Sequence, residues 1–123
     1  MGNRTAEDMV NTLVMEKKAI IMPIRNALLD RGYSEEVEYD YINVEPVLVY
    51  TRSEKNVVFV RHKWEILAGI PLQASNEKEA QLAKEFSSFL NEDEEGKIQL
   101  RFKLPDQGNE LFEALDLLSK NDS

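Results

Sequence analysis

Cysteine is absent from this chain of 123 residues, and histidine occurs once, at position 62. Without thiols the chain can form neither disulfide bonds nor thiolate metal sites, and it holds no cysteine nucleophile. The five glycines are too scattered to build a loop that cradles phosphates. A serine nucleophile needs an adjacent general base, and His62 is the only histidine that could supply one. The sequence therefore predicts no catalytic site and no cofactor, and it favours a binding protein over an enzyme.

Long apolar segments are absent as well. The apolar runs are short, as in residues 20–24 with Pro23 counted, whereas a helix that crosses a membrane needs about 20 apolar residues. The first residues show no signal peptide, because Arg4, Glu7 and Asp8 interrupt any apolar stretch there. We therefore expect a cytoplasmic protein that does not associate with membranes.

Acidic residues outnumber basic ones. The chain has 23 Asp and Glu against 15 Lys and Arg, which gives a formal net charge of −8. Such a field repels the phosphates of nucleic acids and attracts basic partners. The length suits one domain over residues 1–123 with a single hydrophobic core. A basic protein is therefore the expected partner, and nucleic acid is not.

The first third of the chain has the pattern of a helix. Thr5 and Asp8 form a variant of the capping box, which predicts a helix start. From there, apolar residues recur at helical spacing as far as Leu29, and Gly32 suits the C-terminal cap. Pro23 lies inside this stripe, so we expect either a kinked helix or two helices separated at the proline.

The next segment changes to the period of two that is typical of strands. Residues 36–41 alternate between acidic side chains and Val or Tyr. Two runs rich in β-branched and aromatic residues, 47–52 and 57–67, flank the polar residues 53–56, which predicts a hairpin. Residues 69–74 contain Gly and Pro and are expected to form a turn.

The remaining third predicts two helices and a strand. Asn76 and Glu79 form a capping box for a helix that should end near Asn91. Residues 97–104 alternate regularly and predict a strand, after which Asn109 opens the last helix. The expected fold is a single α+β domain, in which helices pack on one face of an antiparallel sheet of three or four strands. The order of elements is α-β-β-(β)-α-β-α.

This layout resembles the fold shared by type III secretion chaperones and the bacterial YbjN-like proteins. The similar pieces are the helix end at residues 28–33, residues 66–72 leading into a helix, and the strand 97–105 before the terminal helix. The resemblance covers most of the chain and implies a small acidic domain that binds partner polypeptides, with a homodimer as a possible state. That family has two strands between its last two helices, where this sequence predicts one.

An acidic and aromatic segment precedes the predicted hairpin. Tyrosines give large contact areas, and carboxylates steer a basic partner towards a surface. We therefore interpret this segment as the partner-binding surface. The alternative is that Tyr39 and Tyr41 face the core while the acids are simply solvated. The predicted contact residues are Glu35, Glu36, Glu38, Tyr39, Asp40 and Tyr41.

A basic patch arises if the two long predicted strands are neighbours. Cations beside an aromatic ring could hold phosphates or stack a base. Ordinary outward-facing ion pairs are the alternative, which Glu65 and the negative net charge favour. The residues of this alternative ligand site are Phe59, Arg61, Lys63, Arg101 and Lys103.

Two further sites can be weighed. An enzymatic site around His62 and Trp64 is one alternative, although a lone histidine on an apolar face is more often a satisfied structural residue. Residues 91–96 mimic the start of a calcium loop, but Phe102 stands where that loop needs its bidentate Glu. We therefore expect an acidic turn in solvent and no metal.

Taken together, these patterns predict a non-enzymatic protein-binding domain for a basic or extended partner, of the adaptor, chaperone, inhibitor or immunity type. Binding of nucleic acid or a phosphate ligand through the basic patch is the second hypothesis. An enzyme built around His62 is the third.

Overall fold

The computed structural model of the chain describes residues 5–42, 44–53, 56–63 and 65–120. This part of the chain forms four α-helices, one 3₁₀ turn and six strands. In chain order they are α1 (Ala6–Asn11), α2 (Met15–Asp30), β1 (Ser34–Asp40), β2 (Glu45–Ser53), β3 (Asn56–Arg61), β4 (Leu67–Leu72), α3 (Glu77–Glu85), η1 (Ser87–Phe89), β5 (Leu90–Glu92), β6 (Ile98–Lys103) and α4 (Gly108–Lys120). The predicted α+β class is confirmed.

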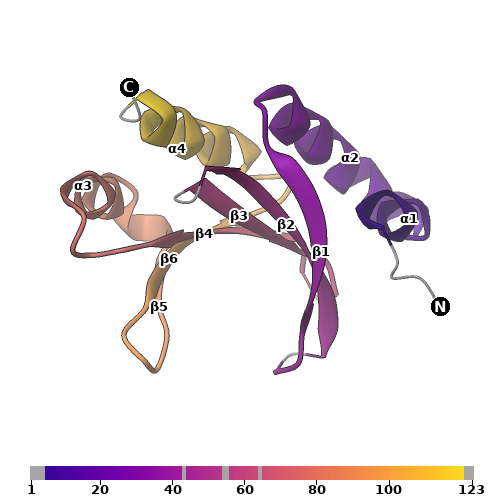
Figure 1. The fold of residues 1–123 in the computed structure, drawn as a ribbon, viewed down its shortest axis with the longest axis horizontal. Coiled ribbons are helices and arrows are strands. Elements are labelled where there is room, and N and C mark those ends of the chain that lie inside the picture. Colours follow the sequence, from indigo (N-terminus) through magenta and orange to yellow (C-terminus); the bar gives the residue numbers. More distant parts are fainter. Residues whose placement is uncertain (1–4, 43, 54–55, 64, 121–123) are drawn as a thin grey trace.

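The six strands form one antiparallel sheet in the order β1-β2-β3-β4-β6-β5. Figure 1 shows that the sheet is arched, with the β5–β6 hairpin descending on one side and the end of β1 and β2 on the other. Helices α1, α2 and α4 lie on the convex side of the arch, and α3 lies beside α4 at the β6 end. No helix of the described residues lies on the concave side (Figure 1). We call the face under the helices the covered face of the sheet and the concave face the open face.

The covered face carries the hydrophobic core. Leu48, Val60, Ala68 and Phe102 are in register across four neighbouring strands, and each is at most 1% exposed. Leu28 of α2 joins them in the same buried cluster, as do Leu111 and Leu115 of α4. Burying each large apolar side chain contributes roughly 1.5–3 kcal/mol, so this layer is the main source of stability.

The predicted number of strands, three or four, is wrong, because Gly and Pro do not mark the ends of the strands in this sheet. The run 57–67 is not one strand: β3 ends at Arg61 and β4 begins at Leu67, and the connection lacks the Gly, Pro or Asn that usually marks a turn. Conversely, β4 contains Gly69 and Pro71, which had predicted a turn. A Cβ built on Gly69 would lie 2.8 Å from Gln99 Oε1, so this glycine permits a close approach within the sheet.

The sixth strand arises from β5, which occupies Leu90–Glu92, where a helix end was predicted. The acidic residues that follow form the turn between β5 and β6. Asp93 Oδ1 accepts hydrogen bonds from the backbone N–H groups of Glu95 and Lys97, each at 2.9 Å. Gly96 follows with φ of 83°, a left-handed conformation that suits glycine. These contacts explain the turn without a metal ion.

Of the two arrangements predicted at Pro23, two helices separated at the proline is wrong. Pro23 lies inside α2, which is continuous from Met15 to Asp30. The chain instead leaves the helix at Thr12, whose hydroxyl donates to the carbonyl of Met9 at 2.8 Å. The predicted N-terminal caps are confirmed: Thr5 accepts from the N–H of Asp8 at 3.1 Å, and Asn76 caps α3. None of the described helices is long and apolar enough to cross a membrane.

Candidate functional site

The open face of the sheet has an apolar centre. Val49 pairs in register with Phe59, and Phe59 pairs with Gly69, so these three residues lie side by side on β2, β3 and β4. Positions two residues away along each strand point to the same side. The resulting apolar floor consists of Val47, Val49, Val57, Phe59, Leu67 and Pro71.

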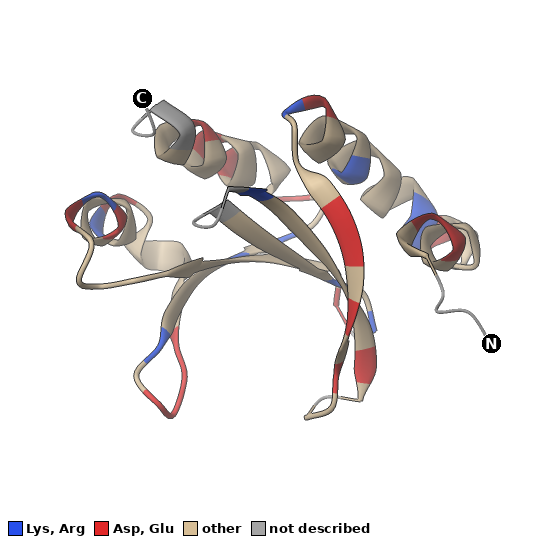
Figure 2. Cartoon of the chain, in the orientation of Figure 1, with Lys and Arg blue, Asp and Glu red and all other residues tan. Residues whose placement is uncertain are grey.

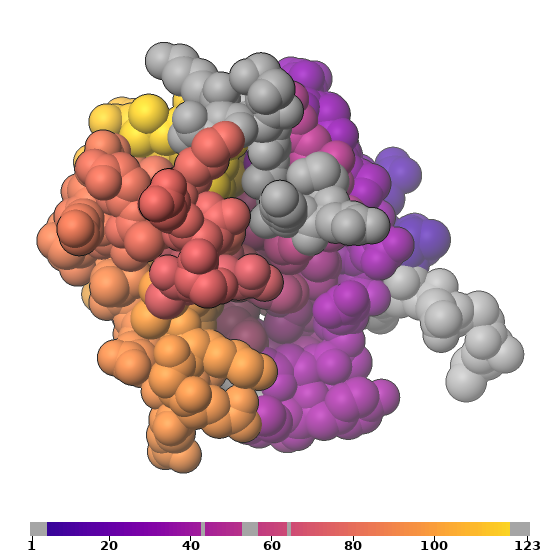
Figure 3. All heavy atoms as spheres, turned by 60° about the vertical axis from the view of Figure 1, so that its left-hand side comes forward, coloured from indigo at the N-terminus to yellow at the C-terminus, as the bar shows by residue number. Residues whose placement is uncertain are grey.

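Two hollows flank Phe59 on this face. The first has a volume of about 200 Å³ and lies towards β1, where Glu38, Tyr39 and Asp40 line it. The second has a volume of about 220 Å³ and lies towards the start of α3, where Gln73 and Asn76 contribute. Figure 3 shows the surface hollowed between the β5–β6 hairpin and the β1–β2 strands. The floor is only partly accessible from the concave side: Val47 and Val49 are 3% and 4% exposed, Val57, Phe59 and Leu67 are half-buried, and Pro71 is exposed.

Opposite charges border the apolar floor. One row in register runs from Glu36 on β1 through Val49, Phe59 and Gly69 to Arg101 on β6. Among the described residues, the exposed side chains of Glu36, Glu38 and Arg101 make no hydrogen bond or ion pair. Figure 2 shows acidic positions along β1, whereas β3 and β4 are mostly uncharged. The face is thus acidic at β1, apolar in the middle and basic at β6.

Arg61, between these borders, is already neutralised. Its Nη1 atom lies 2.7 Å from Asp40 Oδ2 and 3.2 Å from Glu45 Oε1. The Glu45 side chain is only 4% exposed, whereas that of Arg61 is 34% exposed, and the ion pairs tie β1, β2 and β3 together at the open face. Arg61 and Asp40, which the sequence assigned to different patches, therefore belong to one network.

Glu35 lies on the other face, although the sequence grouped it with the partner contacts. It accepts hydrogen bonds from Arg25 Nε at 2.7 Å and from the Tyr50 hydroxyl at 2.6 Å. The hydrogen bond to Glu35 raises the pKa of Arg25. The pKa of Tyr50 is raised mainly by burial and further by its hydrogen bond to Glu35. Glu35 therefore links α2 to the sheet and is not presented to a partner.

The two tyrosines of the predicted surface lie outside the core. Their rings contact edge to face, with centroids 4.9 Å apart, and Tyr41 is 84% exposed. Ile42 and Val44, in the same β1–β2 connection, are also exposed. Of the predicted acidic and aromatic surface, Glu36, Glu38, Tyr39 and Tyr41 are thus accessible and adjoin the open face.

Four of the five residues of the predicted basic patch lie on the open face: Phe59 and Arg101 share one row of the sheet, and Arg61 and Lys103 share the next. Arg61 is paired with Asp40 and Glu45. Lys63 lies after β3 and donates a hydrogen bond to the carbonyl of Val44 at 3.1 Å. Lys103 lies 3.9 Å from Glu65. Arg101 is the member of this set that stands exposed without a partner among the described residues.

His62 follows the end of β3 and is half-buried. Its Nε2 atom is buried without a hydrogen-bond partner among the described residues. Burial, and after it the charge of Lys17, lowers the pKa of His62. Lys17 Nζ donates to the backbone carbonyls of His62 and Lys63, so the histidine lies in a connection anchored to α2. Trp64, which the sequence grouped with it, lies outside the described residues.

We expect the free energy of unfolding to decrease as the pH falls through about 6.5, the ordinary pKa of histidine. Because the pKa of His62 is lower in the folded chain, the unfolded chain binds the proton first and gains stability from it. The loss should level off below the folded pKa. Urea unfolding at about pH 7.5, 6.5 and 5.5 measures this, and the variant His62→Gln should lack the component. An equal decrease in the variant would contradict the assignment.

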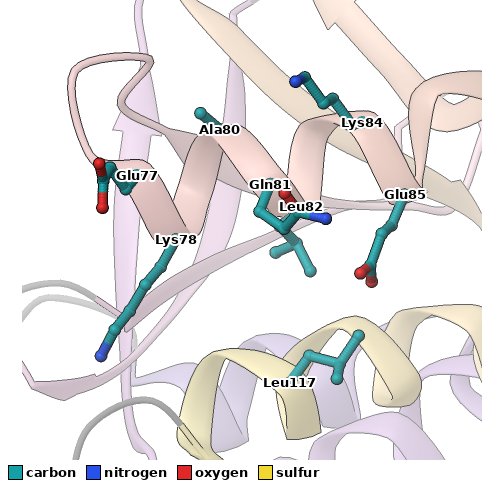
Figure 4. A pocket seen from close by; sticks show the side chains of 8 residues that line it. All are labelled: Glu77, Lys78, Ala80, Gln81, Leu82, Lys84, Glu85 and Leu117. Atoms are coloured by element: carbon teal, nitrogen blue, oxygen red, sulfur yellow. The ribbon is translucent and has the colours of Figure 1, made fainter.

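A groove lies between α3 and α4. It has a volume of about 550 Å³ and lies between Leu82 of α3 and Leu117 of α4 (Figure 4). Its walls carry charges of both signs, including Lys78 and Glu85. Sequence reasoning found neither this groove nor the apolar floor. A signal for the floor existed, since residues 47–50 and 57–60 are apolar on both faces of their strands.

Fold and surface together define an α+β domain whose arched sheet is covered by helices on one face and open on the other. Within the described part of the chain, no three His, Asp or Glu residues are grouped so as to hold a metal ion. Comparisons with protein-family models, with curated proteins and with solved structures give no significant match.

Proposed function

We propose that this chain is a non-enzymatic binding domain that holds a segment of a partner protein on the open face of its sheet. The observation that carries this proposal is the apolar floor, which lies opposite the helix-covered core and reaches the concave surface at Phe59 and Pro71, beside two hollows. Apolar side chains on an open face gain free energy when a partner removes them from water, at roughly 25 cal/mol per Å².

The charges around the floor favour a polypeptide over a nucleic acid. Nucleic-acid binding needs several cations that neutralise successive phosphates. Here Arg61 is neutralised by Asp40 and Glu45, and the unpaired carboxylates Glu36 and Glu38 would repel phosphates. The same carboxylates attract the Lys or Arg side chains of a protein.

The order of elements supports the same proposal. Two strands, β5 and β6, lie between α3 and α4, which is the number that the type III secretion chaperones and YbjN-like proteins have there. We propose on this basis a similar role, the binding of partner polypeptides.

A photo-crosslinking experiment tests the proposal. With p-benzoylphenylalanine at position 59, irradiation in a lysate of the native host should give a discrete crosslinked product. Replacing Glu36 and Glu38 by Lys should reduce its yield about fivefold at low salt, because the attraction for a basic partner becomes repulsion. The yield is measured by gel densitometry, and thermal unfolding checks that each variant is folded.

The matched control carries the crosslinker at Asn26, an exposed position on α2 on the covered side of the molecule. This position should not give the product obtained at position 59. The proposal is wrong if both positions give the same products, or if charge reversal at Glu36 and Glu38 leaves the yield unchanged.

A further inference from the structure

We infer that the segment bound on the open face is an amphipathic helix whose apolar stripe is bordered by basic residues on one side and acidic residues on the other. This inference rests on the proposed function and adds the shape and charge pattern of the partner. It follows from three features of the open face: unpaired charges of opposite sign, their separation, and the concave shape between them.

The unpaired charges lie on opposite borders of the apolar floor. Glu36 and Glu38 on β1 and Arg101 on β6 have no side-chain partner among the described residues. Lys103, two residues along β6 from Arg101, is also exposed, and it lies 3.9 Å from Glu65. The acids of the β5–β6 turn lie beyond the other end of β6, and one of them, Glu95, pairs with Lys97 at 3.3 Å. The β6 border of the floor is therefore basic.

These charges cannot neutralise one another across the sheet. Glu36 and Arg101 are in the same row, with β2, β3 and β4 between their strands. Four strand spacings of about 4.8 Å place the two positions about 19 Å apart along the sheet. That distance exceeds the Debye length of about 8 Å at physiological salt. Each border can be compensated only by charges that a partner brings.

The concave shape favours a helix over an extended strand. A strand gains its affinity from free backbone groups at a sheet edge, but the floor lies on β2, β3 and β4, which are paired on both sides. A helix about 10 Å in diameter presents side chains all round, and its apolar stripe can rest on the half-buried Phe59 and the exposed Pro71. Its two flanks then face β1 and β6.

The charge pattern follows from these flanks. Lysines or arginines on one flank meet Glu36 and Glu38, whereas acidic residues on the other flank meet Arg101 and Lys103. A helix that is basic on both flanks would place like charges beside Arg101. Because like-charge contacts reduce affinity, the face should prefer a helix with flanks of opposite sign.

Three synthetic helical peptides test this inference. Each has about 18 residues and the same leucine stripe; the flanks are Lys and Glu in the first, Lys on both sides in the second, and Glu on both sides in the third. Fluorescence anisotropy at low salt should show that the Lys/Glu peptide binds about fivefold more tightly than either of the others. Amide NMR shifts should locate it at Val49 and Phe59.

Charge reversal on the protein sharpens the test. Arg101→Glu makes both borders acidic, so the peptide with Lys on both flanks should become the tightest ligand. The matched variant Lys97→Glu makes the same charge change at the exposed hairpin, outside the floor, and should leave the order unchanged. Thermal unfolding of both variants confirms that the fold is intact.

The possible failures are distinguishable. If peptides bind at the floor but the Lys/Lys peptide binds wild type at least as tightly as the Lys/Glu peptide, the inference is wrong and the proposed function stands. If Arg101→Glu weakens the binding of all three peptides equally, the inference is also wrong and the proposed function also stands. If no peptide shifts the amides of Val49 and Phe59 while crosslinking at position 59 also fails, the proposed function is wrong.

Discussion

Replacing Arg25 by Ala is expected to lower the free energy of unfolding by about 3 kcal/mol. The guanidinium makes a two-pronged contact with Glu35, with Nε and Nη2 at 2.7 and 3.0 Å from the two carboxylate oxygens. Glu35 is 9% exposed and also accepts a hydrogen bond from the hydroxyl group of Tyr50, which lies fully inside the core. Without Arg25 a nearly buried carboxylate would remain without its counter-charge. Because Arg25 itself is 17% exposed, we expect the lower end of the range for buried pairs.

Urea unfolding followed by circular dichroism measures this loss. Lys97→Ala is the matched control, because it removes a cation from an exposed pair, Lys97 with Glu95, and should change stability by less than about 1 kcal/mol. Equal losses for Arg25→Ala and Lys97→Ala would show that the Arg25–Glu35 contact is no more than a surface ion pair.

Phe102→Ala should destabilise the fold by about 3–5 kcal/mol, whereas Phe59→Ala should lose about 1 kcal/mol. Phe102 is fully buried on the covered face, where its ring lies 4.9 Å from that of Phe89 and 6.2 Å from that of Phe86. Truncating it leaves a cavity that surrounding side chains fill only partly. Phe59 lies part-exposed on the open face, so its truncation leaves no enclosed cavity.

The comparison between these two phenylalanines tests the central feature of the fold, since they lie on opposite faces of the same sheet. Chemical denaturation of both variants gives the two losses directly. Comparable losses at positions 59 and 102 would mean that the concave face is packed as tightly as the covered one, and the proposed binding face would lose its basis.

Local signals in the sequence predicted several elements because each rests on contacts between neighbouring residues. Thr5 and Asn76 cap helices through hydrogen bonds to backbone groups two or three residues away. Gly32, with φ of 89°, closes α2 as its position predicted. The β2–β3 hairpin followed from two runs rich in β-branched and aromatic residues around a polar loop, and β6 followed from alternation of apolar and polar residues.

Elements that depend on distant contacts could not be predicted in this way. The turn between β3 and β4 contains no residue that demands a turn, and Lys17 of α2 anchors it through two backbone carbonyls. Gly69 and Pro71 lie in a strand because β6 pairs with them, at Arg101 and Gln99. Such partners are far away in the sequence, so local propensity gave the wrong answer at these positions.

The candidate site was predicted in part. The sequence identified Glu36, Glu38 and Arg101 as exposed charges, but it assigned them to two unrelated patches. Only the order of strands shows that both patches border one apolar floor. Glu35 was misplaced because one residue of shift along a strand moves a side chain to the other face, and the partner that fixes it, Arg25, comes from a helix.

The position of β1 has a consequence for solubility. It is the longer of the two outermost strands, and such strands can pair with those of other molecules and start aggregation. In β1, however, four of seven residues are acidic, namely Glu35, Glu36, Glu38 and Asp40. Glu35 and Asp40 are paired with Arg25 and Arg61, but two copies meeting edge to edge would bring the carboxylates of Glu36 and Glu38 together, which opposes assembly. The strand that borders the open face thereby helps to keep the free protein from aggregating.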